Sequence, residues 1–234
     1  GSYEATREIA RTAFGQVWRA RSIGEQDERF VVKTIDCGDL AFVADDAIVS
    51  GWLDAFLDGA KAQGSFGDGW VRVHQSGRLS DSAYVVMDAM PLSVARLVEG
   101  RSAISGHVLV AMTTGICDAL RSSRDGAKRW HGNLKGTNVF FDRDTDLNEA
   151  KVVLSDPAAS KEIGADKGEV ADLHAIGELI YQLVVHRAFK ALGGWPVPPG
   201  KEWDRLGKVG SGWRELCSEL LNPADFVTSV PDVA

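Results

Sequence analysis

The side chains best suited to chemistry lie together in residues 130–139, which read W-H-G-N-L-K-G-T-N-V. This segment carries an imidazole at His131, an ammonium group at Lys135, and amides at Asn133 and Asn138. An amide has no basic lone pair at neutral pH, so Asn133 can hydrogen-bond a hydroxyl group but cannot take its proton. A string this short also occurs by chance in loops, so its meaning depends on the rest of the chain.

The segment is similar to the catalytic loop of protein kinases, H-R-D-L-x-x-x-N, and the chain contains further kinase-like segments in the expected order. These are residues 9–19 (I-A-R-T-A-F-G-Q-V-W-R), 30–36 (F-V-V-K-T-I-D), 83–90 (A-Y-V-V-M-D-A-M), 152–158 (V-V-L-S-D-P-A) and 172–177 (D-L-H-A-I-G). They resemble the glycine-rich hairpin, the lysine-bearing strand, the fifth strand with the hinge, the D-F-G turn and the long buried helix of the large lobe. The resemblance spans nearly the whole chain.

One position of the catalytic loop departs from this pattern in a way that decides the chemistry. In kinases the Asp of the loop accepts or orients the proton of the attacking hydroxyl, and the final Asn holds a magnesium ion. Here Gly132 stands in the place of the Arg and Asn133 in the place of the Asp, while Asn138 keeps its place. The resemblance therefore implies a pseudokinase, a kinase-like domain that has lost its catalytic base.

Several residues of a nucleotide site are retained. The resemblance gives Lys33 the role of the lysine that grips the phosphates, Asn138 and Asp156 the roles of the two magnesium ligands, and Met87 the gatekeeper position. Gly15 is the last of the three glycines of the phosphate-binding hairpin. We expect a vestigial cofactor site made of these residues, with Asn138 and Asp156 as metal ligands if any magnesium is bound.

Other parts of the phosphate-binding machinery are missing. The first two glycine positions of the hairpin hold Ala10 and Thr12, whose side chains restrict a close approach of the backbone to phosphates. Residues 40–60 contain no Glu to pair with Lys33, and Asp46 is a short substitute. An unpaired Lys33 is expected to be a weak phosphate clamp.

The adenine pocket is predicted to be filled. At the positions that cover the two faces of the base in kinases, this chain has Val31 and Phe140, and bulky groups there close a slot sized for a purine. A register one residue different would instead place Val139 below the base.

The activation segment is also short, with sixteen positions from Asp156 to Asp172 and no A-P-E motif. Pro157 replaces the aromatic residue of D-F-G and restricts the backbone there. Residues 161–170 (K-E-I-G-A-D-K-G-E-V) are predicted to form a solvated connector, which leaves a peptide substrate nowhere to dock.

Composition restricts the class of protein. The 234 residues are 44% hydrophobic and 25% charged, as in an ordinary globular chain, and the net charge of −7 argues against nucleic-acid binding and against a polybasic membrane anchor. No apolar run is long enough to span a bilayer. The three cysteines, Cys37, Cys117 and Cys217, are odd in number and without a C-x-x-C pair, so reduced and mostly buried thiols are expected.

Hydrophobic periodicity predicts the elements. Residues 30–35, 70–73 and 84–87 are β-rich runs, and the other apolar stripes have helical spacing. The helical stripes are Ile48, Val49, Trp52, Leu53, Phe56 and Leu57; Leu109, Met112, Ile116, Ala119 and Leu120 after an N-cap at Ser105; Leu173, Ile176, Leu179, Ile180, Leu183 and Val184; and Trp213, Leu216, Cys217, Leu220 and Leu221. All of these stripes are expected to be core.

Trp195 and Trp203 lie in a loop rich in Gly and Pro, where an exposed indole would suit a partner, although packing against the domain is more common. Thr228 and Ser229 are conceivable modification sites.

These observations predict a two-lobed α+β protein kinase-like fold, with a small β-rich lobe containing one helix (residues 1–90) and a larger, mainly helical lobe (residues 91–234). We expect no phosphotransfer, weak or absent ATP and magnesium binding, and a scaffold or regulatory role in binding other proteins, in the cytoplasm and within a larger protein. Two alternatives stay open: a pseudokinase that binds nucleotide without transferring phosphate, and a low-activity small-molecule phosphotransferase of the aminoglycoside-kinase type, whose H-G-D motif would explain Gly132.

Overall fold

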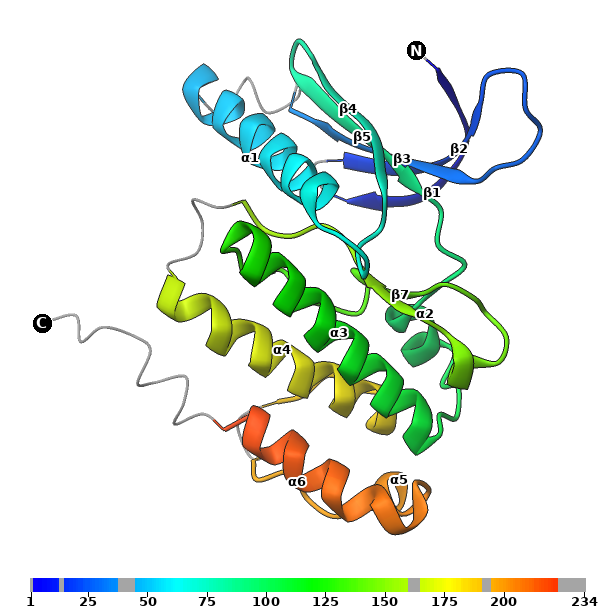
Figure 1. Cartoon of the computed structure of the whole chain (residues 1–234), viewed down its shortest axis with the longest axis vertical. Helices are drawn as coiled ribbons and strands as arrows, with labels where there is room; N and C mark the ends of the chain where they lie inside the picture. Colours follow the sequence, from blue (N-terminus) through cyan, green and yellow to red (C-terminus); the bar gives the residue numbers. More distant parts are fainter. Residues whose placement is uncertain (1, 13–14, 38–44, 160–164, 191–194, 223–234) are drawn as a thin grey trace, which may run out of the picture.

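The structure, a computed structural model, consists of a five-stranded antiparallel sheet and a mainly helical part (Figure 1). It describes residues 2–12, 15–37, 45–159, 165–190 and 195–222. At Asp46 and at residues 165–167 only the backbone is described. The sheet has the order β1-β2-β3-β5-β4. Its strands are β1 (Tyr3–Thr12), β2 (Gly15–Ser22), β3 (Phe30–Asp36), β4 (Val73–Leu79) and β5 (Ser82–Asp88). The predicted strands at 30–35 and 84–87 are confirmed as β3 and β5.

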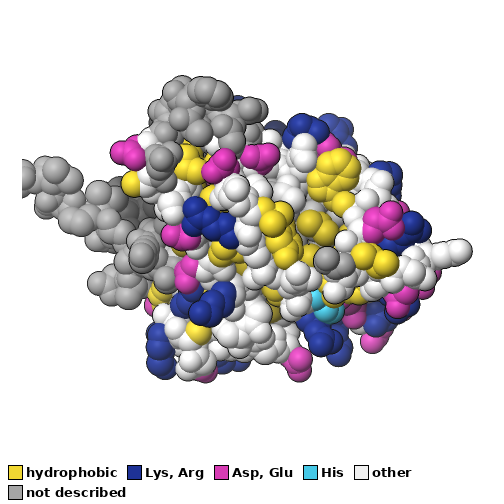
Figure 2. All heavy atoms as spheres, turned by 90° about the horizontal axis from the view of Figure 1, so that it is seen from above, with side chains coloured by type: hydrophobic (Ala, Val, Ile, Leu, Met, Phe, Trp, Pro, Cys, Tyr) yellow, Lys and Arg dark blue, Asp and Glu magenta, His cyan; other side chains and the backbone are white. Residues whose placement is uncertain are grey.

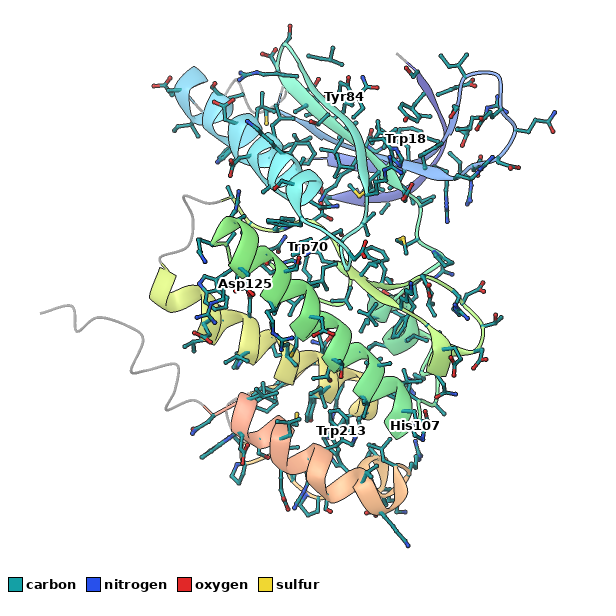
Figure 3. All side chains as sticks on the ribbon, in the orientation of Figure 1. Trp18, Trp70, Tyr84, His107, Asp125 and Trp213 are labelled. Atoms are coloured by element: carbon teal, nitrogen blue, oxygen red, sulfur yellow. The ribbon has the colours of Figure 1, made fainter. Side chains whose placement is uncertain are left out.

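The third predicted strand is wrong over most of its length. Among residues 70–73 only Val73 belongs to β4, while Trp70 forms an isolated bridge with Leu154. The indole N–H of Trp70 donates to the carbonyl of Ala119 at 3.1 Å, and its ring is buried in the core of the helical part. Residues 70–73 thus contact both parts of the molecule, because Val73 belongs to β4 and Trp70 packs in the core of the helical part. Figure 3 shows Trp70 between the two parts, near one end of α3.

Helix α1 (Asp46–Ser65) packs on the sheet against β4 and β5. It begins after Asp45, whose carboxylate accepts the N–H of Ala47 at 3.0 Å as an N-cap. The side chains of Val49 and Leu53 on α1 are buried, as predicted. Ile48 and Trp52 are not core, because they lie at the edge of the apolar stripe and remain 49% and 43% exposed.

The helical part is built from α2, α3, α4, α5 and α6 with a small three-stranded sheet of order β6-β7-β8. The bounds are β6 (Leu92–Ser93), α2 (Val94–Glu99), α3 (Gly106–Ala127), β7 (Val139–Phe141), η2 (Leu147–Glu149), β8 (Val152–Leu154), α4 (Ala165–Val185), α5 (Lys201–Asp204), η3 (Gly207–Val209) and α6 (Gly210–Leu220). In Figure 1, α3 and α4 cross the middle of the molecule and α5 and α6 close the end farthest from the large sheet.

The predicted stripe of α3 is confirmed, with Leu109, Met112 and Ile116 fully buried and the hydroxyl of Ser105 accepting the N–H of Val108 at 3.3 Å. Two other stripes are less complete, since Leu173 on α4 and Leu216 on α6 are 42% and 36% exposed.

The connector predicted for residues 161–170 is wrong from residue 165 onward, where α4 already begins. The polar sequence of this turn suggested a loop, but Gly168 allows the helix to pack closely on Trp130. A Cβ atom at Gly168 would collide with the indole ring. Residues 161–164 lie outside the described part.

The remaining predictions concern tryptophans and cysteines. Trp203 is buried in the core, whereas Trp195 is 41% exposed and donates its indole N–H to the carbonyl of Ser218 at 2.9 Å. The three cysteines are free thiols, two of them buried (Cys37 and Cys217) and one half-buried (Cys117). Thr228 and Ser229 lie outside the described residues. Among the helices that the structure describes, none combines the length and the apolar character needed to cross a membrane.

Candidate functional site

The loop after α3 is held by a buried carboxylate on α4. Asp172 is 2% exposed, and its two oxygens accept the backbone N–H groups of His131 and Gly132, each at 2.8 Å. Burial raises the pKa of the Asp172 carboxyl to about 6, against the lowering effect of these two hydrogen bonds. Sequence reasoning placed Asp172 only at a helix start and missed this role, because hydrogen bonding to backbone amides leaves no pattern in the sequence.

His131 is a structural part of this loop. Its ring is fully buried and stacks on Trp70, with ring centroids 5.4 Å apart, and its Nδ1 accepts the N–H of Asn133 at 3.2 Å. Burial lowers the pKa of His131 to about 4, so the ring is neutral at pH 7. Gly132 follows with φ of 65°, a left-handed conformation that costs glycine least, which gives a physical reason for Gly at this position.

Asn133 ties the loop to the segment that follows β8. Its side-chain amide donates to the carbonyl oxygen of Asp156 at 3.0 Å, and its backbone carbonyl accepts the amide of Asn138 at 2.8 Å. Asn138 is 4% exposed, and its Oδ1 accepts the hydroxyl of Thr137 at 3.3 Å. Both amides therefore hold backbone and neighbouring side chains in place.

Lys33 on β3 is paired, contrary to the expectation of an unpaired lysine. Its Nζ lies 2.7 Å from Oδ1 of Asp156, and the side chains are 30% and 22% exposed. The other carboxylate oxygen of Asp156 accepts the hydroxyl of Ser155 at 3.1 Å. On α1 the ring of Phe56 lies 5.9 Å from the ammonium group, and the side chain of Asp46 is outside the described part. Among the described side chains, the carboxylate that pairs with Lys33 is thus that of Asp156.

Gln63 is a site residue that sequence reasoning missed. Its side chain is buried, with Nε2 donating to the carbonyl of Val71 at 2.7 Å and Oε1 accepting the N–H of Asp156 at 2.8 Å. These two bonds connect α1 to the backbone of Val71, just before β4, and to the backbone of Asp156, just after β8. A glutamine seven residues after Phe56 shares its helix face, which is the only signal the sequence offers.

The hairpin at the start of the sheet pairs β1 with β2 in antiparallel order, with register shifts between Ala5 and Arg7 and between Glu8 and Ala10. Ala10 pairs with Val17 and Thr12 pairs with Gly15, while residues 13–14 lie outside the described part. A Cβ atom at Gly15 would collide with the backbone oxygen of Thr34, so packing against β3 explains this glycine.

The space between the sheet and β7 is occupied by apolar side chains. Val31 and Phe140 pack against one cluster that includes the buried Val85 and Met87. Alternation along β7 buries Val139 and Phe141 in the helical core and turns Phe140 toward the large sheet. The predicted register is therefore correct, and the alternative with Val139 facing the sheet is wrong.

The groups predicted to bind magnesium make contacts with other residues of the chain. Magnesium binds proteins through one or two carboxylates together with substrate phosphates. The one carboxylate of the predicted pair, that of Asp156, is already bonded to Lys33 and Ser155, and the oxygen of Asn138 is bonded to Thr137. The described residues contain no cluster of three or more His, Cys, Asp or Glu side chains that would hold a metal ion.

A cavity of about 430 Å³ lies behind this site, between α1 and the Asp156 segment. Lys33, Met87, Asn133 and Asp156 line it, so four of the predicted site residues do meet around one space. Gly15 and Asn138 are not part of its lining.

The arrangement defines a protein kinase-like fold, and comparison with solved structures supports this. The chain is similar to two crystal structures of the Mycobacterium tuberculosis PknI kinase domain, a double mutant with a TM-score of 0.63 and a single mutant with a TM-score of 0.61. In both cases the sequence identity is 18%, and the match covers 96% of this chain and 89% of the PknI chain. No protein-family model matches the sequence, and no curated protein sequence matches it. The predicted two-part α+β fold is confirmed.

Proposed function

We propose that this chain is a kinase-like domain that transfers no phosphate and acts by binding other proteins. The observation that carries the proposal is the hydrogen bond from the Asn133 amide to the carbonyl of Asp156. The side chain in the place of the catalytic base is thereby a hydrogen-bond donor to the backbone, and an amide cannot accept a proton from a hydroxyl group at neutral pH. Loss of a general base costs roughly 10²–10⁴ in rate.

Weak or absent nucleotide binding is the second part of the proposal. It is supported by the packing of Val31 and Phe140 at the adenine position and by the direct pairing of Lys33 with Asp156. A nucleotide would have to displace the apolar side chains and compete with a carboxylate for the lysine.

Calorimetric titration with ATP and Mg²⁺ tests this part. We expect no saturable heat up to millimolar ATP. One-to-one binding that disappears in both Lys33→Ala and Asp156→Ala would instead support a domain in which the nucleotide is a structural ligand.

Protein binding is the third part, and α1 offers the surface that fits it best. Ile48 and Trp52 are four residues apart, share a helix face and remain exposed. Figure 2 views the molecule from the end that carries the large sheet, where Lys and Arg side chains alternate with Asp and Glu and hydrophobic side chains gather near the centre. The net charge of −7 and the free thiols suit a protein partner in a reducing compartment such as the cytoplasm.

A matched pair of variants tests the α1 surface. Ile48→Asp places a charge on it, and Leu79→Asp places the same charge on a 63% exposed residue at the end of β4. Affinity capture followed by mass spectrometry is expected to lose specific proteins with Ile48→Asp only. Identical sets of captured proteins for both variants and the unmodified chain would contradict the assignment of this surface.

A further inference from the structure

A separate cavity lies in the helical part, at the C-terminal end of α4, where α4 packs between α2 and α5 (Figure 1). It measures about 360 Å³, within the range of pockets that hold small molecules. Its lining comes from the segment after α2 (within 101–104), the end of α4 with the two residues that follow it (183–187), and the α5 region (within 202–206). It shares no residue with the site around Asn133 or with the exposed surface of α1.

Positive charge dominates this cavity. Among the described residues that line it, Arg101, Arg187 and Arg205 are basic and Glu202 alone is acidic, which gives a local net charge of +2 in a chain of net charge −7. His186 also lines the cavity, and its pKa is lowered by burial and by the charges of Arg101 and Arg205. Because both guanidinium groups act on this one ring, their charges converge on the same space.

The hydrogen-bond donors of these arginines are largely unused within the described part of the chain. Arg101 and Arg205 make no side-chain hydrogen bond or ion pair there, and Arg187 donates from Nε to the hydroxyl of Tyr181 at 3.4 Å. The Nδ1 atom of His186 is buried and has no partner among the described residues either. A bound water or ion is a usual reason for such an unpaired atom, so the cavity has both charge and donors to offer a ligand.

The C-terminal ends of α2 and α4 give a competing reason for basic residues here. Unpaired carbonyl groups at a helix C-terminus favour nearby positive charge. In the described structure, however, none of the three guanidinium groups donates to a carbonyl of these last turns, and Arg187 bonds Tyr181 instead. The helix ends therefore favour the positive charge but leave the donors available.

The chemistry of the lining points to an anion that carries an apolar group. A phosphate monoester has about 1.5–2 negative charges at neutral pH and three acceptor oxygens, and the planar guanidinium group pairs with phosphate oxygens through two parallel hydrogen bonds. Ala103, Ile104 and Leu206 provide apolar surface beside the arginines. We propose that this cavity binds a phosphate monoester of an apolar group, with its phosphoryl dianion held by the three guanidinium groups.

This inference goes beyond the proposed function and does not depend on the loss of phosphotransfer. Finding phosphate transfer would overturn the proposed function and leave the anion site standing, whereas a cavity that binds no phosphate monoester would leave the inactive-kinase proposal standing. Two sources share the proposed chemistry: a free phosphate monoester and a phosphorylated tyrosine side chain of a protein partner.

Calorimetric titration of the whole chain with phenyl phosphate tests the inference, with phenol and inorganic phosphate as probes of the two halves of the ligand. Arg101→Gln and Arg205→Gln each remove one positive charge from the cavity. Arg96→Gln removes the same charge from an exposed residue of α2 that does not line the cavity, and is the matched control. N-acetyl-phosphotyrosine amide separates the two sources, because it carries a peptide backbone on the phosphorylated ring.

We expect one-to-one binding of phenyl phosphate to the unmodified chain and to Arg96→Gln. Each cavity variant should lose affinity by about tenfold or more, because charge-assisted hydrogen bonds are lost, and phenol and inorganic phosphate should each bind the unmodified chain more weakly by a similar factor. Binding of the amide at least as tight as that of phenyl phosphate supports a phosphorylated side chain as the source, and weaker binding supports a free monoester. The inference is overturned by the absence of saturable binding, by binding that both cavity variants retain, or by equal binding of phenol or of inorganic phosphate.

Discussion

Replacing Asp172 with Asn should change how the stability of the protein responds to pH. Burial raises the pKa of this carboxyl from 3.8 to about 6, so the folded state holds its proton more tightly than the unfolded state does. The contribution of Asp172 to the stability of the folded state is fully present below pH 3.8 and is lost as the pH rises through about 6. The difference between the two pKa values corresponds to about 3 kcal/mol, of which about 1.4 kcal/mol is lost between about pH 5 and pH 7.5.

His131 acts in the opposite direction. Burial lowers its pKa from 6.5 to about 4, so its contribution is present above 6.5 and is lost as the pH falls toward 4. Between about pH 7.5 and pH 5 this loss amounts to about 2 kcal/mol. The backbone N–H of His131 donates to Asp172, so the two opposing responses belong to one hydrogen-bonded unit and nearly cancel in the unmodified protein.

Asp172→Asn removes one response and leaves the other. The amide cannot titrate, and its NH₂ group faces a backbone N–H, which costs about 1–3 kcal/mol at any pH. The free energy of unfolding of the variant should therefore fall by about 2 kcal/mol between about pH 7.5 and pH 5, against about 0.5 kcal/mol for the unmodified chain.

Urea unfolding of both proteins at several pH values measures this difference. The exposed Asp125→Asn variant is the control for loss of one negative charge. Equal pH responses in Asp172→Asn and the unmodified chain would refute the account of the buried carboxyl.

Two further predictions concern packing. Gly59→Ala brings a Cβ to 2.8 Å from the carbonyl of Pro157 and should destabilise the protein by about 1–3 kcal/mol. Gly51→Ala on the same helix meets no atom within 4 Å and should stabilise the protein by about 0.5–1 kcal/mol. Thermal unfolding of the two variants measures this difference, and equal shifts of the melting temperature would contradict the close contact at Gly59. The double variant Val31→Ala, Phe140→Leu enlarges the space at the proposed adenine position and should give saturable ATP binding in the calorimetric titration in which the unmodified chain gives none. No saturable binding by the double variant would show that these side chains do not limit nucleotide binding.

The sequence predicted the elements in which a local pattern decides the structure. β3 follows from a β-branched run, α3 from its capping serine and apolar stripe, and Phe140 from its place in the kinase-like motif. Such features depend on neighbouring residues, which the sequence displays directly.

Features that depend on distant partners were missed. The buried Gln63 and Asp172 bond backbone groups far along the chain, and the pairing of Lys33 with Asp156 joins residues 123 positions apart. The start of α4 escaped prediction because the fit of Gly168 against Trp130 is a tertiary contact that overrides a polar, loop-like sequence.

The exposed Ile48 and Trp52 show the limit of periodicity. Six apolar residues at helical spacing cover more of the α1 surface than the sheet can bury, so the side chains at the edge of the stripe remain at the surface. The pattern therefore predicts a helix correctly but overstates its buried face.

The central claim is that Asn133 leaves this fold without a base for phosphate transfer. Incubation of the purified chain with radiolabelled ATP, Mg²⁺ and generic protein and aminoglycoside acceptors tests it most directly, with Asn138→Ala as the control for activity from a contaminant. We expect no incorporation above background in either protein. Incorporation by the unmodified chain that Asn138→Ala abolishes would contradict the claim.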